Sequence, residues 1–196
     1  MKKRRILNIG CGKTRIPNSL GLDIAPIPEY VDVVHDLNVF PYPFSSASFE
    51  EIHMYHILEH LEDPLKVLQE VYRLLKPGGY AFIRVPHFSS KGAFTDITHK
   101  RPFGYNSFDC LEKQNAQHYY TMSSFFIEEK EIRYLGLLQD LSYHGTQSTS
   151  VVLEFAKLVE RGMNLLIRLS PLLFERLWCY WVGGATEVYI KLRKEE

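Results

Sequence analysis

The sequence lacks the features that define several large classes of protein. Its 23 Lys and Arg residues are balanced by 23 Asp and Glu residues, so the formal net charge is zero. A nucleic-acid-binding protein that works through a broad basic field is therefore not expected. Because no run of about eighteen uncharged apolar residues occurs, we expect no membrane-spanning helix. The basic start "MKKRR" reaches Asn8 and Gly10 too soon for a signal-peptide core to follow it.

Cysteine is scarce as well. Cys11, Cys110 and Cys179 lie far apart and form no CxxC pair. A disulfide framework or a zinc knuckle is therefore not expected, and a reducing cytoplasm is the expected location. With 196 residues, of which 45% are hydrophobic, the chain is long enough for one domain with a sizeable core and short for two.

Short apolar runs alternate with turn signals along the chain. We expect strands at these runs, which cover residues 4–10, 19–24, 31–36, 48–56 and 80–86. Between the last two, a helix is expected to begin at Pro64 with Asp63 as its N-cap, and Gly78–Gly79 are expected to stop it. Strands that alternate with a helical crossover imply a parallel α/β sheet.

The segment "HILEH", from His56 to His60, matches H-x-x-E-H, the signature of an inverted zinc peptidase. Two histidines four apart share one helix face and could hold a zinc ion. However, the segment directly follows a strand and is cut off by Asp63 and Pro64, where a new helix begins. There is room for little more than one helical turn, whereas the peptidase needs a long helix and a third ligand. We therefore predict a connector between strand and helix, and no metal site.

The first strand runs into a glycine loop, Gly10-Cys11-Gly12-Lys13. Open parallel sheets bind ligands at the carboxyl ends of their strands, where glycines allow close approach of the backbone and offer N–H groups to an anion. The loop is not a P-loop, because Leu7 stands where that motif needs its first glycine. It is not a dinucleotide fingerprint either, because Arg15 stands at the third glycine position.

Aspartates close the next two strands. Asp23 ends "LGLDI" and Asp36 ends "VVHDL". A carboxylate at the end of the second strand can accept hydrogen bonds from both ribose hydroxyls of a nucleoside, and one at the next strand can accept a bond from the adenine amino group. Either aspartate alone could equally be a turn or cap residue. Three successive strand ends with the same chemistry predict a nucleoside site.

These motifs together resemble the class I S-adenosylmethionine-dependent methyltransferases, of the group often called methyltransferase type 11. "ILNIGCGKT" is similar to the first motif of that family, "GLDI" to its acidic ribose-binding motif and "VVHDL" to its adenine-binding motif. Residues 40–87, with "HILEH" and "LLKPGGYAFIRVPH", resemble its fourth strand, the following helix and its fifth strand. The resemblance covers about Arg5 to Phe108.

The resemblance implies an α/β fold: a Rossmann-like, seven-stranded sheet with an antiparallel last strand and helices on both faces. It implies S-adenosylmethionine as the cofactor. The residues that it implies for cofactor binding are Asn8, Gly10, Cys11, Gly12, Lys13, Asp23, Ile24, Asp36, Leu37, Met54, Tyr55 and His56. In that family the segment after the fourth strand lines the methionine end of the cofactor, which again disfavours a zinc peptidase.

The chain departs from this pattern in two places. Only "KTRIPNSL" links the glycine loop to the second strand, and Pro17 disfavours a long helix there, so a loop or a single turn is expected. Before the last strand, residues 136–184 form an insert that is mostly helical in pattern within one domain, 1–196.

The insert has broad apolar faces with many aromatic residues. Its large aromatic side chains are Phe155, Phe174, Trp178, Tyr180 and Trp181. These faces could pack on the domain or on a partner subunit, form a lid over an acceptor pocket, or contact a membrane surface. Charges of both signs interrupt the pattern, which favours protein contact, with the insert as a cap on the acceptor side and a homodimer through it as one candidate.

Methyl transfer asks little of the protein, because the sulfonium is already activated and alignment with exclusion of water supplies much of the catalysis. A base is needed only where the attacking atom carries a proton. The candidates are His87, after the fifth strand, and Asp96 and His99 in "FTDITHKRPFGYNSF". Two functions remain open: a methyltransferase acting on an unidentified small molecule, and a module that binds the cofactor or a nucleoside without turnover.

Overall fold

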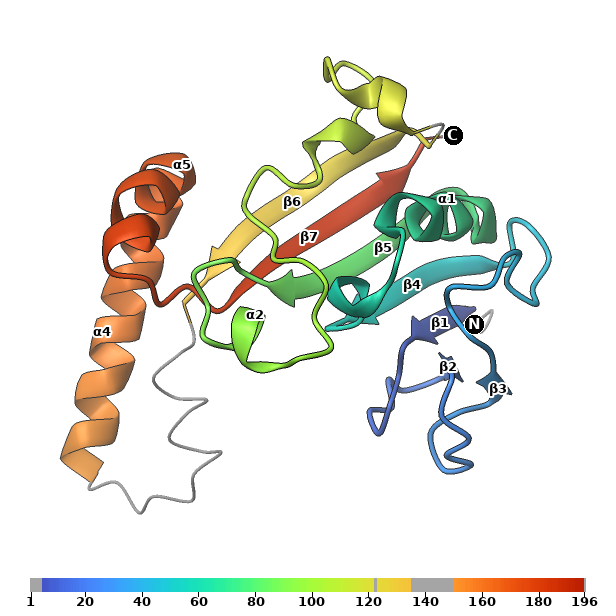
Figure 1. The fold of residues 1–196 in the computed structure, drawn as a ribbon, viewed down its shortest axis with the longest axis horizontal. Coiled ribbons are helices and arrows are strands. Elements are labelled where there is room, and N and C mark those ends of the chain that lie inside the picture. Colours follow the sequence, from blue (N-terminus) through green and yellow to red (C-terminus); the bar gives the residue numbers. More distant parts are fainter. Residues whose placement is uncertain (1–4, 122, 135–149, 196) are drawn as a thin grey trace.

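Seven strands form one mixed sheet in the computed structural model, which describes residues 5–121, 123–134 and 150–195 (Figure 1). The strands are β1 (Ile6–Ile9), β2 (Ser19–Asp23), β3 (Val33–Val34), β4 (Phe49–Tyr55), β5 (Leu75–Pro86), β6 (Phe125–Arg133) and β7 (Glu187–Lys194). Their order across the sheet is β3-β2-β1-β4-β5-β7-β6, and β7 runs antiparallel to both of its neighbours. The other pairs, from β3 to β5, are parallel. The predicted sheet with an antiparallel last strand is confirmed.

The main crossover helix is α1 (Pro64–Leu74). Asp63 is its N-cap, because the carboxylate Oδ1 accepts a hydrogen bond from Lys66 N at 3.1 Å. The predicted stop at Gly78–Gly79 is wrong. The helix ends at Leu74, since β5 begins at Leu75, where it pairs with Phe49 of β4, and both glycines lie inside that strand.

The other elements are shorter or belong to the insert. They are the 3₁₀ turns η1 (Leu58–His60), η2 (Asp109–Leu111) and η3 (His118–Tyr120), the helices α2 (Gly92–Thr95), α4 (Ser150–Leu169) and α5 (Pro171–Leu173), and the π-helical segment η4 (Phe174–Cys179). Both crossovers that flank β2, residues 10–18 and 24–32, are described throughout and form no helix. The loop expected after β1 is thus confirmed.

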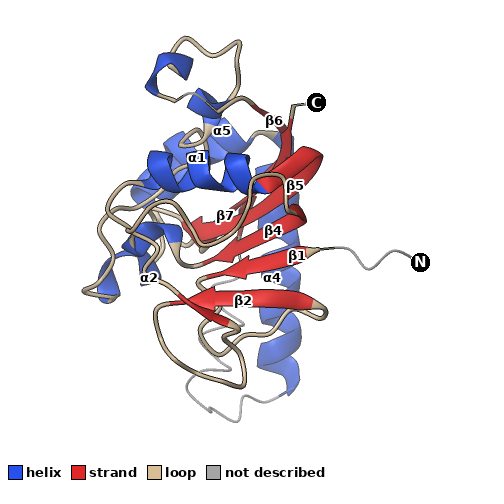
Figure 2. Cartoon of the chain, turned by 90° about the vertical axis from the view of Figure 1, so that its right-hand side faces the viewer, coloured by secondary structure: helices blue, strands red, loops and turns tan. Residues whose placement is uncertain are grey.

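The two faces of the sheet are covered differently. Figure 2 shows α1 and α2 on one side of the sheet and α4 on the other. Towards α1 the strands present fully buried side chains such as Ile52, Ile83 and Ile190. The opposite face carries half-buried side chains in contact with one another: His53 stacks on Phe82 with the ring centroids 4.7 Å apart. Since the first two crossovers supply no helix, polar and aromatic side chains replace helix packing on this face.

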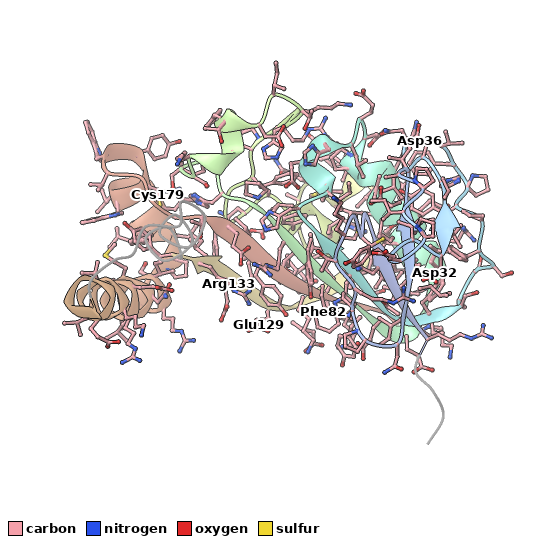
Figure 3. All side chains as sticks on the ribbon, turned by 90° about the horizontal axis from the view of Figure 1, so that it is seen from below. Asp32, Asp36, Phe82, Glu129, Arg133 and Cys179 are labelled. Carbon is pink, nitrogen blue, oxygen red and sulfur yellow. The ribbon has the colours of Figure 1, made fainter. Side chains whose placement is uncertain are left out.

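The insert is helical, as predicted, from Ser150 onward. Residues 136–149 and the side chain of Phe155 lie outside the described part of the protein. α4 packs near the end of β6 in a second, smaller hydrophobic cluster, which includes Ile132, Met163, Ile167, Phe174, Cys179 and Ala185. Figure 3 shows Cys179 of the insert at the opposite end of the molecule from Asp32 and Asp36.

A buried carboxylate joins the last three strands of the sheet. Glu187 of β7 accepts hydrogen bonds from Arg84 of β5, with Nη2 2.7 Å from Oε2, and from Arg133 of β6, with Nη1 3.3 Å from Oε1. Burial by itself raises the pKa of this carboxyl group. Hydrogen bonds from His56 and Arg84, with their charges, outweigh burial and lower the pKa of Glu187 to about 2.

Replacing Glu187 by glutamine should lower the free energy of unfolding by about 2 kcal/mol at pH 7, because two arginines lose their anionic partner. The folded-state pKa lies below the ordinary 4.5. The stabilisation is therefore complete above pH 4.5 and is lost as the pH falls towards about 2. Urea unfolding at pH 7 and near pH 3 should show the gap between wild type and Glu187→Gln shrinking at the lower pH. The exposed Glu154→Gln is the control, and an equal gap at both pH values would contradict the assignment.

Candidate functional site

The glycine loop after β1 packs against the turn that follows β4. Gly10 and Gly12 have positive φ angles of 66° and 50°, a conformation that favours glycine. A Cβ atom on Gly10 would lie 2.3 Å from Ile57 Cγ1, so only glycine allows this approach. At Gly12 no atom lies within 4 Å of the corresponding position, which leaves the backbone open to a ligand.

The amide groups of the loop are used mainly within the protein. Gly10 N and Cys11 N both donate to Leu22 O, at 2.8 and 3.3 Å. The Asn8 side chain donates to Thr14 O at 3.0 Å and so ties the end of β1 to the loop. Hydrogen bonds within the protein therefore preorganise the loop for a ligand.

Asp23, the last residue of β2, holds the same loop. Its Oδ2 accepts a hydrogen bond from Gly12 N at 2.8 Å, and its Oδ1 accepts one from Ala25 N at 2.9 Å. Each carboxylate oxygen keeps a second acceptor position, which suits ribose hydroxyls. Beside it Ile24 is 64% exposed, an apolar surface that a flat base could cover. The residues present therefore fit a nucleoside.

Asp36 lies just past β3 and forms a turn. Its Oδ1 accepts from Asn38 N at 2.9 Å, so the turn role that the sequence left open is present. Leu37 is buried, and its carbonyl accepts from Tyr42 Oη at 2.9 Å. Among the other expected cofactor residues, Lys13 is exposed, whereas Met54 is fully buried inside the sheet.

The end of β4 places a positive charge at the site. Tyr55 turns its ring to the half-open face of the sheet, where its hydroxyl lies 2.8 Å from His53 Nδ1. His56 follows with a φ of 54°. Its Nε2 is 3.2 Å from Glu187 Oε2 and its Nδ1 is 3.6 Å from Glu59 Oε1. Hydrogen bonding to Glu187, then to Glu59, raises the pKa of His56 to about 9, so the ring is protonated at neutral pH.

The "HILEH" segment forms one 3₁₀ turn, η1, as the sequence predicts for a connector. A loop from residues 96–101 is fastened to it. Lys100 N donates to Glu59 O at 2.9 Å, and the Arg101 guanidinium donates to Leu61 O at 2.8 Å. These bonds bring His99 against the turn.

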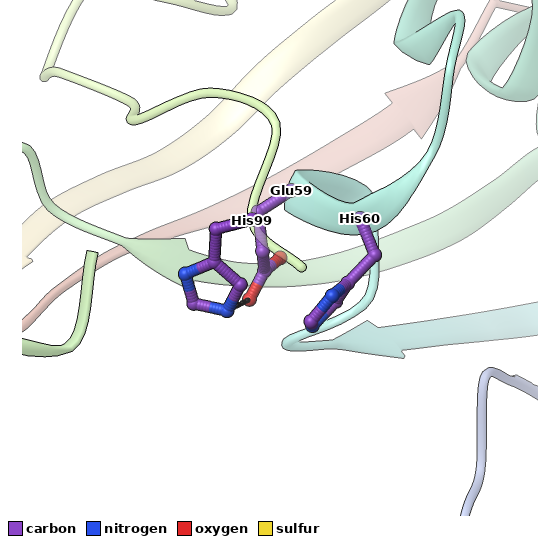
Figure 4. A group of neighbouring side chains, drawn as sticks. All are labelled: Glu59, His60 and His99. Atoms are coloured by element: carbon purple, nitrogen blue, oxygen red, sulfur yellow. Dashed lines mark ion pairs between the residues drawn. The ribbon is translucent and has the colours of Figure 1, made fainter. Parts of the chain in front are cut away.

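Figure 4 shows the result, a group made of Glu59, His60 and His99. The two histidine rings meet edge to face with their centroids 4.6 Å apart, and His99 Nε2 lies 3.9 Å from Glu59 Oε1. Asp96 Oδ2 is 3.8 Å from the same nitrogen. Hydrogen bonds from the Thr98 hydroxyl and N–H lower the pKa of Asp96. The structure thus unites two of the three candidate catalytic residues.

The third candidate, His87, lies elsewhere. Its side chain is fully buried, with Nδ1 2.9 Å from Ser89 Oγ and Nε2 3.0 Å from Glu175 Oε1. Glu175 also accepts from Tyr105 N at 2.6 Å. His87 therefore fastens the insert to the end of β5. Its role as a base stays a prediction that this environment does not favour.

Sequence reasoning weighed Glu59 and His60 as parts of a zinc-peptidase motif, set that motif aside and placed the segment in the cofactor pocket. The signal was the H-x-x-E-H spacing itself. The zinc-peptidase interpretation drew attention to the two histidines, but the partner of Glu59 and His60 is His99, which arrives from a separate loop.

Comparison with known proteins identifies the family. A family described as "Methyltransferase domain" matches residues 2–129. The ubiquinone biosynthesis O-methyltransferase of Paracidovorax citrulli is 28% identical over 112 residues, covering 46% of this chain and 47% of that protein. Methyltransferase str2 of Strobilurus tenacellus is 35% identical over 95 residues, covering 41% of this chain and 34% of that protein. The chain spans less than half the length of these curated relatives.

Solved structures share the fold. The crystal structure of a SAM-dependent methyltransferase from Archaeoglobus fulgidus superposes with a TM-score of 0.60 at 19% identity, covering 98% of this chain and 87% of that one. The sequence match spans most of the chain and includes the glycine loop, Asp23, Asp36 and the η1 turn. The chain therefore belongs to the methyltransferase-domain family, a family of class I S-adenosylmethionine-dependent methyltransferases.

Proposed function

We propose that the protein transfers a methyl group from S-adenosylmethionine to a small-molecule acceptor. The observation that carries this proposal is the carboxylate of Asp23, fixed between Gly12 N and Ala25 N beside the exposed Ile24. This arrangement suits the ribose and the base of the cofactor. Bound there, the cofactor supplies an activated methyl group, and the protein has to align it and exclude water.

The group around His99 supports an acceptor that loses a proton. Gly10 packs on Ile57, so the η1 turn that carries Glu59 and His60 adjoins the glycine loop. An attacking hydroxyl would form its bond to the methyl carbon as the carbon–sulfur bond breaks, and its proton would leave to His99 or Asp96. Similarity to proteins named O-methyltransferase supports oxygen as the attacking atom.

Asp23→Ala should weaken binding of S-adenosylhomocysteine by roughly 2–4 kcal/mol, because it removes two hydrogen bonds to a charged acceptor. Titration calorimetry measures this directly. Asp32→Ala is the control: its carboxylate accepts from Gly21 N, in the middle of β2, at 2.7 Å, so it tests for loss of fold and not for loss of ligand contacts. Unchanged affinity of Asp23→Ala for S-adenosylhomocysteine would contradict the proposal that Asp23 binds the ribose.

Turnover separates an enzyme from a module that only binds. With methyl-labelled cofactor and a panel of hydroxylated small molecules, we expect acceptor-dependent formation of S-adenosylhomocysteine. His99→Asn should lower this rate at least about tenfold and keep cofactor affinity, since a positioned base contributes 10²–10⁴-fold. His87→Asn should instead lower the melting temperature. Tight cofactor binding without turnover on any acceptor would favour the binding module.

Within the described part of the chain, the insert exposes a large apolar surface. A groove of about 390 Å³ is lined by Leu166, Leu169, Ser170, Leu173, Phe174, Leu177, Trp178 and Val182. No described helix is long and apolar enough to cross a membrane. Because charges of both signs interrupt the apolar pattern of the insert, we propose that residues 136–184 form a cap through which two copies of the chain associate.

Leu169→Glu should convert a dimer to a monomer, because it places a charge in the apolar groove. Sedimentation velocity measures the change in mass. Tyr119→Glu is the matched control, since Tyr119 is 76% exposed and Leu169 is 75% exposed, but Tyr119 lies in η3, away from the insert. A wild-type chain that sediments as a monomer at all concentrations would exclude association through the cap.

A further inference from the structure

Glu59 is a buried carboxylate that accepts no hydrogen bond from the described residues. Its side chain is 0% exposed. Among the described residues, neither of its carboxylate oxygens has a hydrogen-bond partner. The facing nitrogens are His56 Nδ1 at 3.6 Å and His99 Nε2 at 3.9 Å, and both distances exceed a hydrogen bond. The protonated His56 supplies a nearby positive charge, but a buried carboxylate also needs hydrogen bonds or ligand bonds to its oxygens, and Glu59 has none among the described residues.

The hydrogen bonds of the two neighbouring histidines fix their tautomers. The Thr98 hydroxyl donates its one proton to Asp96 Oδ1 at 2.6 Å. It must therefore accept the bond from His60 Nδ1 at 2.8 Å, so Nδ1 carries a proton and, in the neutral ring, Nε2 keeps a lone pair. The same holds for His99, whose Nδ1 faces Ala93 O at 3.4 Å, because a carbonyl oxygen can only accept.

This is the arrangement that metal-binding histidines have. Their second nitrogen donates to an oxygen, which orients the ring and directs the other nitrogen to the metal. One ligand atom from each of Glu59, His60 and His99 can be chosen so that all lie within 4.8 Å of one another (Figure 4). Zinc bonds of about 2.0–2.2 Å need the donors somewhat closer, so metal binding would draw the three side chains together.

We propose that Glu59, His60 and His99 bind a divalent transition-metal cation. One carboxylate and two imidazoles are a ligand set for zinc and its neighbours, and three protein ligands leave a coordination position open. The hydrogen bonds of Lys100 and Arg101 fix the η1 turn and the 96–101 loop to each other. The two segments that carry the ligands are therefore preorganised.

The site also defines the acceptor more closely, and this part of the inference rests on the proposed methyl transfer. A cation polarises an oxygen bound to it and lowers its pKa. The acceptor class is then a hydroxylated compound that offers one or two oxygens to the cation. As the carbon–oxygen bond forms and the carbon–sulfur bond breaks, the hydroxyl proton passes to solvent or to Asp96, and His99 is a ligand instead of the base.

The expectation of no metal came from the short room around "HILEH" and from the family resemblance, and it considered His56 and His60 as the pair of ligands. His56 is not in the ligand group, since its Nε2 pairs with Glu187 and its positive φ takes it out of any helix shared with His60. The third ligand comes from the 96–101 loop. A peptidase is not implied, because η1 is a single turn.

The test uses the full chain, stripped with a chelator and titrated with Co²⁺. We expect one equivalent of Co²⁺ to bind, with visible absorption bands typical of cobalt in a site with imidazole ligands. Glu59→Gln, which keeps the shape and removes the charge, should weaken binding at least about tenfold, as should His99→Asn. His118→Asn is the matched control, because that ring bonds Cys110 O and Ser124 Oγ outside the group. Circular dichroism verifies that each variant folds.

The wild-type chain failing to bind Co²⁺, or Glu59→Gln and His99→Asn both binding it as wild type does, would overturn the metal site. Calorimetry with S-adenosylhomocysteine tests the proposed function separately. A chain that binds S-adenosylhomocysteine but not Co²⁺ would overturn only the metal site. A chain that binds Co²⁺ but not S-adenosylhomocysteine would overturn only the proposed methyl transfer. Asp23→Ala should lose cofactor affinity and keep the cobalt spectrum. Transfer that continues unchanged after chelation would overturn the role in acceptor binding.

Discussion

The contact between Gly10 and Ile57 is the constraint on which the site depends. It joins the loop after β1 to the turn after β4, and it leaves no room for a Cβ atom at Gly10. Because β1 and β4 are parallel neighbours, both segments leave the same edge of the sheet. The close approach then puts the groups that suit the cofactor, on β1 and β2, beside the polar turn that carries Glu59 and His60.

Around this edge, the protein uses carboxylates as structural connectors. Asp23 joins the glycine loop to the end of β2, and Glu187 gathers Arg84, Arg133 and His56 from neighbouring segments. Each of these carboxylates has several donors. Glu59 is the exception, buried equally deeply but without hydrogen bonds from the described residues. The proposed metal site rests on this lack of hydrogen bonds to the Glu59 carboxylate, and not on the number of acidic residues nearby.

The unusual parts of the fold follow from what the crossovers contain. Without helices in the first two crossovers, one face of the sheet keeps half-buried aromatic and charged side chains such as His53, Phe82 and Lys191, with Lys191 Nζ 5.9 Å from the Phe82 ring centroid. The insert instead places the helices α4 and α5 near the end of β6. His87 and Tyr105 both bind Glu175 there, so the insert is attached through polar contacts near the end of β5.

The sequence by itself predicted the five strands of the first half and the N-cap at Asp63, because these depend on local periodicity and turn chemistry. The antiparallel last strand was predicted from the resemblance to a family, whose motifs neighbouring residues carry. The sequence misplaced the end of α1, since strand pairing of Leu75 with Phe49 overrides the double glycine as a stop signal. Only the tertiary structure separated His87 from His99 and brought His99 to Glu59. Those positions depend on hydrogen bonds between loops distant in the chain, Lys100 N to Glu59 O above all, and no local pattern encodes such a bond.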